Sequence, residues 1–105
     1  YALDGNVSAV VGTHTHVPTA DYQILEKGTA YITDVGMSGD YNSIIGMNKQ
    51  DALNRFMFPN NKKSKLEVSL GEPTMCGVII DTLSNGLSKS IKPLRLGGRL
   101  EQTIL

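Results

Sequence analysis

The chain contains only two histidines, His14 and His16, which lie two positions apart directly after an apolar run at residues 7–11. Neutral imidazole is a good ligand for zinc, iron and manganese, so the pair is a candidate for part of a metal site. In an extended chain, residues two apart point to the same face, with Cβ atoms about 6.6 Å apart. Paired hydrolytic metals lie about 3.5–4 Å apart, so the spacing suits one histidine per metal. The alternative is a pair of solvent-facing or hydrogen-bonded histidines near a strand end.

Two histidines do not complete such a site, because a catalytic metal normally has at least three protein ligands. Asp34 ends an apolar run and is the candidate for an outer acceptor that orients a metal-bound histidine. The alternative for Asp34 is a cap of the turn at residues 36–39. The other candidate carboxylates follow no ligand spacing, and they are Asp4, Asp21 and Asp40. We therefore expect most ligands of a complete site to lie outside this chain.

Length and composition predict one globular domain of 105 residues, 40% of them hydrophobic. Ten basic and ten acidic residues cancel, which gives no electrostatic case for nucleic acid or an anionic membrane. Cys76 is the only cysteine, so it forms no internal disulfide, and its apolar neighbours predict a buried small side chain. No apolar run is long enough for a membrane span, and a cytoplasmic location is expected.

The elements that must position the histidines are short strands and one helix. Apolar, β-branched runs predict strands at residues 7–11, 22–25 and 29–33, the first of them buried on both faces. A helix is predicted at residues 48–58, with Asn48 as its N-cap and Asp51 in a variant of the capping box. An apolar stripe on this helix is predicted to face the core, and it consists of Ala52, Leu53, Phe56 and Met57.

The second half of the chain predicts a β-meander after a polar linker at residues 60–64. Residues 66–70 alternate strictly between apolar and polar, which is typical of a half-buried strand. Residues 74–81 and 87–94 predict two further strands, joined by the Asn85-Gly86 hairpin signal. The pattern as a whole predicts an α/β (α+β layered) fold.

The surroundings of the histidines resemble the last metal-binding motif of the calcineurin-like metallophosphoesterases, Gly-His-x-His or a variant of it. Here that motif is Gly12-Thr13-His14-Thr15-His16. Its continuation through residues 28–37, 43–46, 71–73 and 77–81 is similar to the YmdB-like family of that superfamily. The resemblance predicts that residues 1–94 are the C-terminal segment of a metallophosphoesterase domain, and it leaves residues 95–105 as an unassigned tail.

The resemblance implies a β-sandwich flanked by helices and a dinuclear phosphodiesterase that hydrolyses 2′,3′-cyclic nucleotides to 3′-nucleotides. His14 would ligate one of two divalent cations (iron, manganese or zinc) and His16 the other. The bridging glutamate, the remaining ligands and an acid histidine would come from earlier in the enzyme and have no counterpart here. The expected partners are a small-molecule phosphodiester, the missing N-terminal segment and, in a homo-oligomer, further copies. The segment alone is expected to be inactive.

Two other hypotheses stay open at this point. The missing ligands and the edges of the predicted meander also fit a non-catalytic β-rich assembly module or a split-gene remnant. The other hypothesis is a small mononuclear zinc-binding protein, in which a carboxylate such as Asp34 would complete the site.

Overall fold

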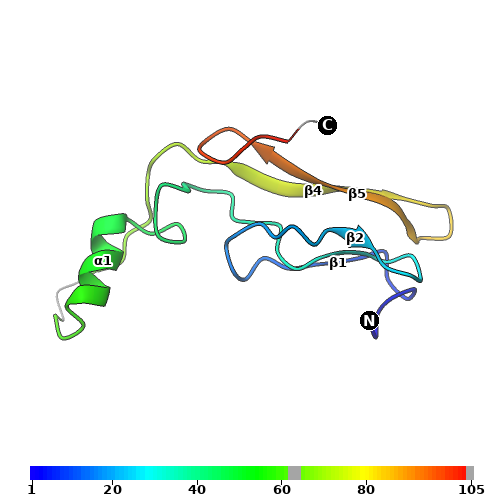
Figure 1. Cartoon of the computed structure of the whole chain (residues 1–105), viewed down its shortest axis with the longest axis horizontal. Coiled ribbons are helices and arrows are strands. Elements are labelled where there is room, and N and C mark those ends of the chain that lie inside the picture. The colour runs from blue at the N-terminus through cyan, green and yellow to red at the C-terminus, as the bar shows by residue number, and fades with distance from the viewer. Residues whose placement is uncertain (62–64, 104–105) are drawn as a thin grey trace.

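The computed structural model of the protein describes residues 1–61 and 65–103 and confirms the mixed α/β class (Figure 1). The three predicted N-terminal strands and the helix are all present, although shorter than expected. In chain order the elements are β1 (Ala9–Val11), β2 (Gln23–Ile24), β3 (Ala30–Ile32), α1 (Lys49–Met57), β4 (Met75–Thr82) and β5 (Ser88–Leu96).

The strands form two sheets that pack on each other. In the three-stranded sheet β3 lies in the centre, parallel to β1 and antiparallel to β2. Strands β4 and β5 form an antiparallel hairpin, and its strand β5 contacts β2 and β3. The buried apolar core between them consists of Ala30, Ile32 and Ile91. Strand β1 is an edge strand of this sheet, and Val11 is 47% exposed, so the prediction that β1 is buried on both faces is wrong.

The hairpin signal at Asn85-Gly86 is confirmed, with Gly86 at φ 88° in the turn between β4 and β5. Strand β5 continues through residue 94 to Leu96. The chain then folds back, because Thr103 donates its backbone N–H to Arg95 O over 3.1 Å, and its hydroxyl accepts from Arg95 N over 2.9 Å. Residues 97–103 therefore pack against the end of β5.

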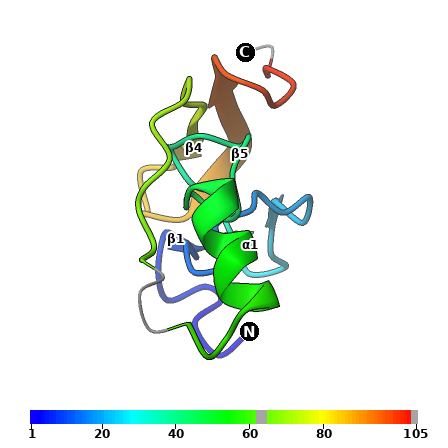
Figure 2. The same ribbon diagram turned by 90° about the vertical axis from the view of Figure 1, so that its left-hand side faces the viewer.

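Helix α1 begins after the predicted cap, because the Asn48 side chain accepts from Gln50 N and Asp51 N at 3.0 and 3.2 Å. The reciprocal half of the capping box is wrong, since Asn48 N donates to Glu67 O instead. The apolar stripe does not face a core: α1 has no buried residue, and Phe56 is 83% exposed. The helix lies at one end of an elongated molecule of 54 × 30 × 17 Å (Figures 1 and 2).

The predicted strand at residues 66–70 is wrong, and the expected meander is a hairpin only. In the described part of the chain this segment makes one isolated bridge, Met47 with Val68, together with the Ser69 N to Gly46 O bond. Leu70 is 95% exposed. The polar linker predicted at residues 60–64 falls partly outside the described residues. No helix within the described ranges has the length and apolar character needed to cross a membrane.

Candidate metal site after strand β1

The loop that carries both histidines starts at a fixed point beside β3. Gly12 donates its N–H to Ile32 O over 3.2 Å, and Gly12 O accepts from Val35 N over 2.9 Å. A Cβ atom at residue 12 would stand 2.0 Å from Thr33 O, so only glycine permits this approach of the two backbones. The loop therefore leaves the carboxyl end of β1 in register with β3.

The two histidines do not lie on an extended chain, contrary to the geometry assumed from their spacing. The chain bends through residues 14–17, and His16 has φ 67°, in the left-handed region that few residues other than glycine adopt. His14 is exposed and His16 is half-buried. Their assignment to two metals consequently cannot rest on the alternation of an extended chain.

The His16 ring is held by a backbone carbonyl, since Nδ1 lies 2.8 Å from Ile45 O. A carbonyl oxygen only accepts, so Nδ1 carries the hydrogen, and in the neutral imidazole Nε2 is then the nitrogen with the lone pair. Metal-binding histidines commonly donate their second ring N–H to a carbonyl or carboxylate in this way. Ile45 itself has φ 47°, and among the described residues it and His16 are the two non-glycine residues with positive φ. The two residues with positive φ, His16 and Ile45, are thus joined by this hydrogen bond.

Asp34 is fully buried and ties the histidine loop to the sheet. Its Oδ2 accepts from Thr15 N at 2.5 Å and from Thr15 Oγ1 at 2.7 Å, and its Oδ1 accepts from Gly36 N at 2.8 Å. The alternative interpretation of Asp34, as a cap of the turn at residues 36–39, therefore agrees with the structure. Asp34 also fixes Thr15, the residue between the two histidines, although the structure shows no hydrogen bond from Asp34 to either imidazole ring.

The Asp34 carboxyl is an anion at neutral pH. Burial alone would raise its pKa, but the hydrogen bonds from Thr15 and Gly36 and the nearby His16 together hold the pKa below its usual value. This negative charge lies next to the loop that carries both histidines.

The other candidate carboxylates serve local structure away from the histidines. Asp4 accepts from Lys27 N and Thr29 N, and Asp21 binds both Thr19 and Thr33. Within the described residues no group of three histidine, cysteine or acidic side chains could hold a metal ion. A mononuclear zinc site completed by Asp34 is therefore not supported, and the two histidines are at most part of a ligand set.

Sequence reasoning missed Tyr41, whose hydroxyl joins the histidine loop to the glycine-rich loop after β3. The hydroxyl accepts from Met37 N at 2.7 Å, donates to Met37 O at 2.8 Å and lies 3.3 Å from His16 O. Burial raises the pKa of Tyr41, followed by its contact with Cys76, so the hydroxyl keeps its proton. Cys76 is only partly buried, 3.4 Å from this hydroxyl, which corrects the expectation of a buried side chain.

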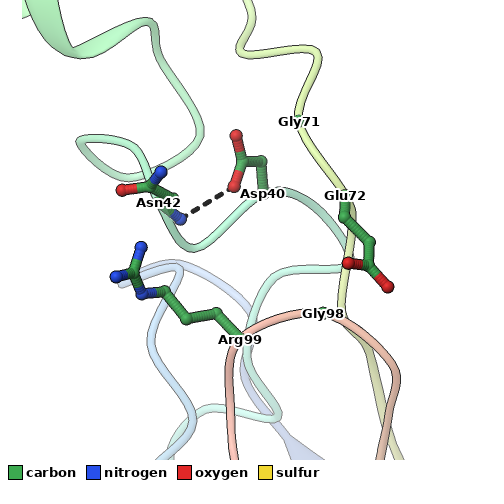
Figure 3. A pocket seen from close by; sticks show the side chains of 6 residues that line it. All are labelled: Asp40, Asn42, Gly71, Glu72, Gly98 and Arg99. Carbon is green, nitrogen blue, oxygen red and sulfur yellow. Dashed lines mark hydrogen bonds between the residues drawn. The ribbon is translucent and has the colours of Figure 1, made fainter.

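A polar cavity of about 310 Å³ lies elsewhere, where residues 40–42, 71–72 and 98–99 meet (Figure 3). Asp40 accepts there from Asn42 N at 2.8 Å and from the Ser69 hydroxyl, and these bonds lower the pKa of its carboxyl. The Arg99 side chain extends toward Asn42, whereas the Glu72 carboxylate points away from Asp40. Neither histidine lines this cavity, so it is separate from the candidate metal site.

A comparison with known families decides where the chain belongs. The sequence model of the family described as YmdB-like protein matches residues 1–94, nearly the whole chain. The chain belongs to the YmdB-like family. A relative from Bacillus subtilis (strain 168), named 2′,3′-cyclic-nucleotide 2′-phosphodiesterase, is 50% identical over 93 residues, which are 89% of this chain and 34% of that protein.

Two solved structures share the fold of this YmdB-like chain. A hypothetical protein from Thermus thermophilus is 39% identical with a TM-score of 0.82, over 92% of this chain and 37% of that one. A structure described as a novel phosphatase, from Mycoplasma pneumoniae, is 37% identical with a TM-score of 0.78, over 91% and 34%. The chain thus spans about a third of the length of these relatives and corresponds to a C-terminal part of the YmdB-like protein.

Proposed function

We propose that this chain is the C-terminal segment of a dinuclear metal-dependent phosphodiesterase acting on phosphodiesters such as 2′,3′-cyclic nucleotides. His14 and His16 would each ligate one of two divalent cations. The observation that carries the proposal is the 2.8 Å bond from His16 Nδ1 to Ile45 O, because it leaves Nε2 as the free ligand atom. The name of the Bacillus subtilis relative supports the substrate class.

The reaction is the addition of one water to a cyclic diester. The P–O2′ bond breaks, the 2′ oxygen takes a proton, and a 3′-monophosphate remains. Two divalent cations would lower the pKa of the attacking water and neutralise charge on the phosphoryl oxygens. Imidazole ligands suit iron, manganese or zinc in this role.

The residues of this chain supply one wall of that site. His14 and His16 would offer neutral imidazole nitrogens. Asp34, through Thr15, holds the loop between the two rings, and Ile45 fixes the tautomer and direction of His16. The remaining ligands, including a bridging carboxylate, would come from the part of the relatives that this chain does not span. We therefore expect the chain alone to be inactive and its activity to need that part, in cis or in trans.

The test joins the chain to the upstream part and measures metal content and 2′,3′-cyclic AMP hydrolysis by phosphorus NMR. His14→Ala and His16→Ala should each lower the metal content from two ions toward one. Each should lower kcat more than about a hundredfold, beyond the usual effect of losing an outer partner. Thr13→Ala is the matched control, because Thr13 is an exposed neighbour in the same loop. Histidine variants that keep both metals and full activity would contradict the proposal.

A further inference from the structure

An apolar cavity of about 330 Å³ borders the His16 side of the candidate metal site. Its volume is at the lower end of the range of about 300–1,000 Å³ typical for small-molecule sites. His16 forms one wall, and the apolar surface comes from Val17, Met37, Ile44 and Ile45. Val17, Ile44 and Ile45 are 52%, 51% and 55% exposed. Exposed aliphatic side chains thus gather beside a residue that would hold a cation.

The polar side chains of this cavity are already committed to the protein. The Ser43 hydroxyl donates to Asp40 O and accepts from Gly46 N at 2.9 Å. The Tyr41 hydroxyl accepts from Met37 N and donates to Met37 O. Neither hydroxyl keeps a hydrogen to donate to a ligand. The cavity therefore offers apolar contact and no side-chain hydroxyl donor that could select one pattern of ligand acceptors.

The turn at residues 44–47 fixes the position of one cavity wall and the orientation of the His16 ring. Ile44 and Met47 exchange backbone hydrogen bonds of 3.0 and 2.9 Å, which hold Ile45 in its left-handed conformation between them. The Ile45 carbonyl then fixes His16, while Ile44 and Ile45 line the cavity. A Cβ atom at Gly46 would stand 2.8 Å from Met37 Sδ, so the turn is packed against the opposite wall. The apolar surface is consequently held at a fixed distance from the His16 ring.

We propose that this cavity binds the nucleoside ring of a cyclic phosphodiester whose phosphate is held at the metal site, an inference that rests on the proposed function. An apolar wall next to a cation site fits a ligand with a flat ring at one end and a phosphate at the other. Every base presents an apolar face, so binding by such contact tolerates all four bases. We expect the KM values of the four 2′,3′-cyclic nucleotides to agree within about tenfold, an energy difference of about 1.4 kcal/mol.

The experiment compares 2′,3′-cyclic AMP with ethylene phosphate, a five-membered cyclic diester that carries no ring system beyond the diester itself. The enzyme is the chain together with the upstream part. Ile44→Asn should raise the KM for 2′,3′-cyclic AMP about tenfold, or about 1.4 kcal/mol, while the KM for ethylene phosphate shifts less than about twofold. Ile44→Val keeps the apolar wall, so its KM for 2′,3′-cyclic AMP should stay close to that of the wild type. Leu83→Asn is the matched control, 47% exposed before the β4–β5 turn and outside the cavity.

The two proposals fail in different ways. A wild-type enzyme that binds no metal and hydrolyses neither substrate overturns the proposed function, and the subsite with it. An active enzyme in which Ile44→Asn changes both KM values equally, or neither, overturns the subsite alone. The metal content of each Ile44 variant, measured in the same samples, shows that His16 is still held.

Discussion

Asp34 is the side chain whose loss should disturb the histidine loop most directly. In Asp34→Asn an NH₂ group replaces one of the two carboxylate oxygens. The single oxygen that remains cannot accept the hydrogen bonds of both Thr15 and Gly36. We expect the metal affinity of the enzyme joined to its upstream part to fall about tenfold, the lower end of the range for groups bonded directly to metal ligands, because Asp34 acts through Thr15. Isothermal titration with manganese measures this. Asp81→Asn, which changes an exposed carboxylate on β4, should leave the affinity as it is.

Asp21 should make the fold sensitive to acid. Hydrogen bonds from the Thr19 and Thr33 hydroxyls lower the pKa of Asp21 from 3.8 to about 2. A folded-state pKa below the unfolded value contributes stability above pH 3.8, and this contribution is lost as the pH falls toward 2. We expect the melting temperature of Asp21→Asn to fall less steeply than that of the wild type between these pH values. Equal slopes in thermal melts at pH 4, 3 and 2 would refute this role of Asp21.

At the scale of residues, the sequence was enough to single out the candidate side chains but not to predict their conformation. His14 and His16 stand out because they are the only histidines, and Gly12 marks the end of their strand. Nothing local predicts that His16 adopts φ 67° or that its ring bonds to Ile45, 29 positions later. The Tyr41 hydroxyl is a further example, since two of its partners, His16 and Cys76, are brought close only by the fold.

Helix α1 should depend on its cap more than helices that pack on a core. It has nine residues and no buried side chain, and isolated helices shorter than about 12–15 residues are marginal in water. Asn48→Ala removes the acceptor for Gln50 N and Asp51 N and should destabilise α1 by about 1 kcal/mol. Hydrogen exchange of α1 amides should quicken while exchange in β3 stays slow. Gln50→Ala, which keeps the cap, serves as the control.

Elements were predictable where a local signal was enough to specify them. The Asn48 cap and the Asn85-Gly86 turn are such signals, and the structure confirms both. The strand at residues 66–70 was wrong because alternation describes one chain, whereas a strand needs a partner backbone. In the described part of the chain Val68 forms only an isolated β-bridge with Met47, so this segment joins no sheet. The prediction that the apolar stripe on α1 faces a core failed as well, since α1 has no buried residue.

The whole molecule is more open than its length predicts. Its accessible surface is 7409 Å², against about 5,700 Å² for a compact monomer of this mass. Its radius of gyration is 17.3 Å, against about 13 Å for a compact domain of 100 residues. Exposed apolar side chains occur along α1 and the segment after it, including Phe56 at 83% and Leu70 at 95% exposure. Such a surface is typical of a chain that packs against further protein.

We therefore expect the chain alone to self-associate, and the chain joined to its upstream part to do so less. Exposed apolar surface gains free energy when a second copy covers it, so the average mass should rise with concentration. Phe56→Glu with Leu70→Lys places charges on this surface and should lower the mass in light scattering toward 11.3 kDa. Ile79→Glu, which charges a 39% exposed position on β4, is the control and should not. A wild-type chain that is monomeric at all concentrations and fully folded by circular dichroism would contradict this prediction. The chain would then be stable with the apolar side chains of α1 and the following segment exposed to water.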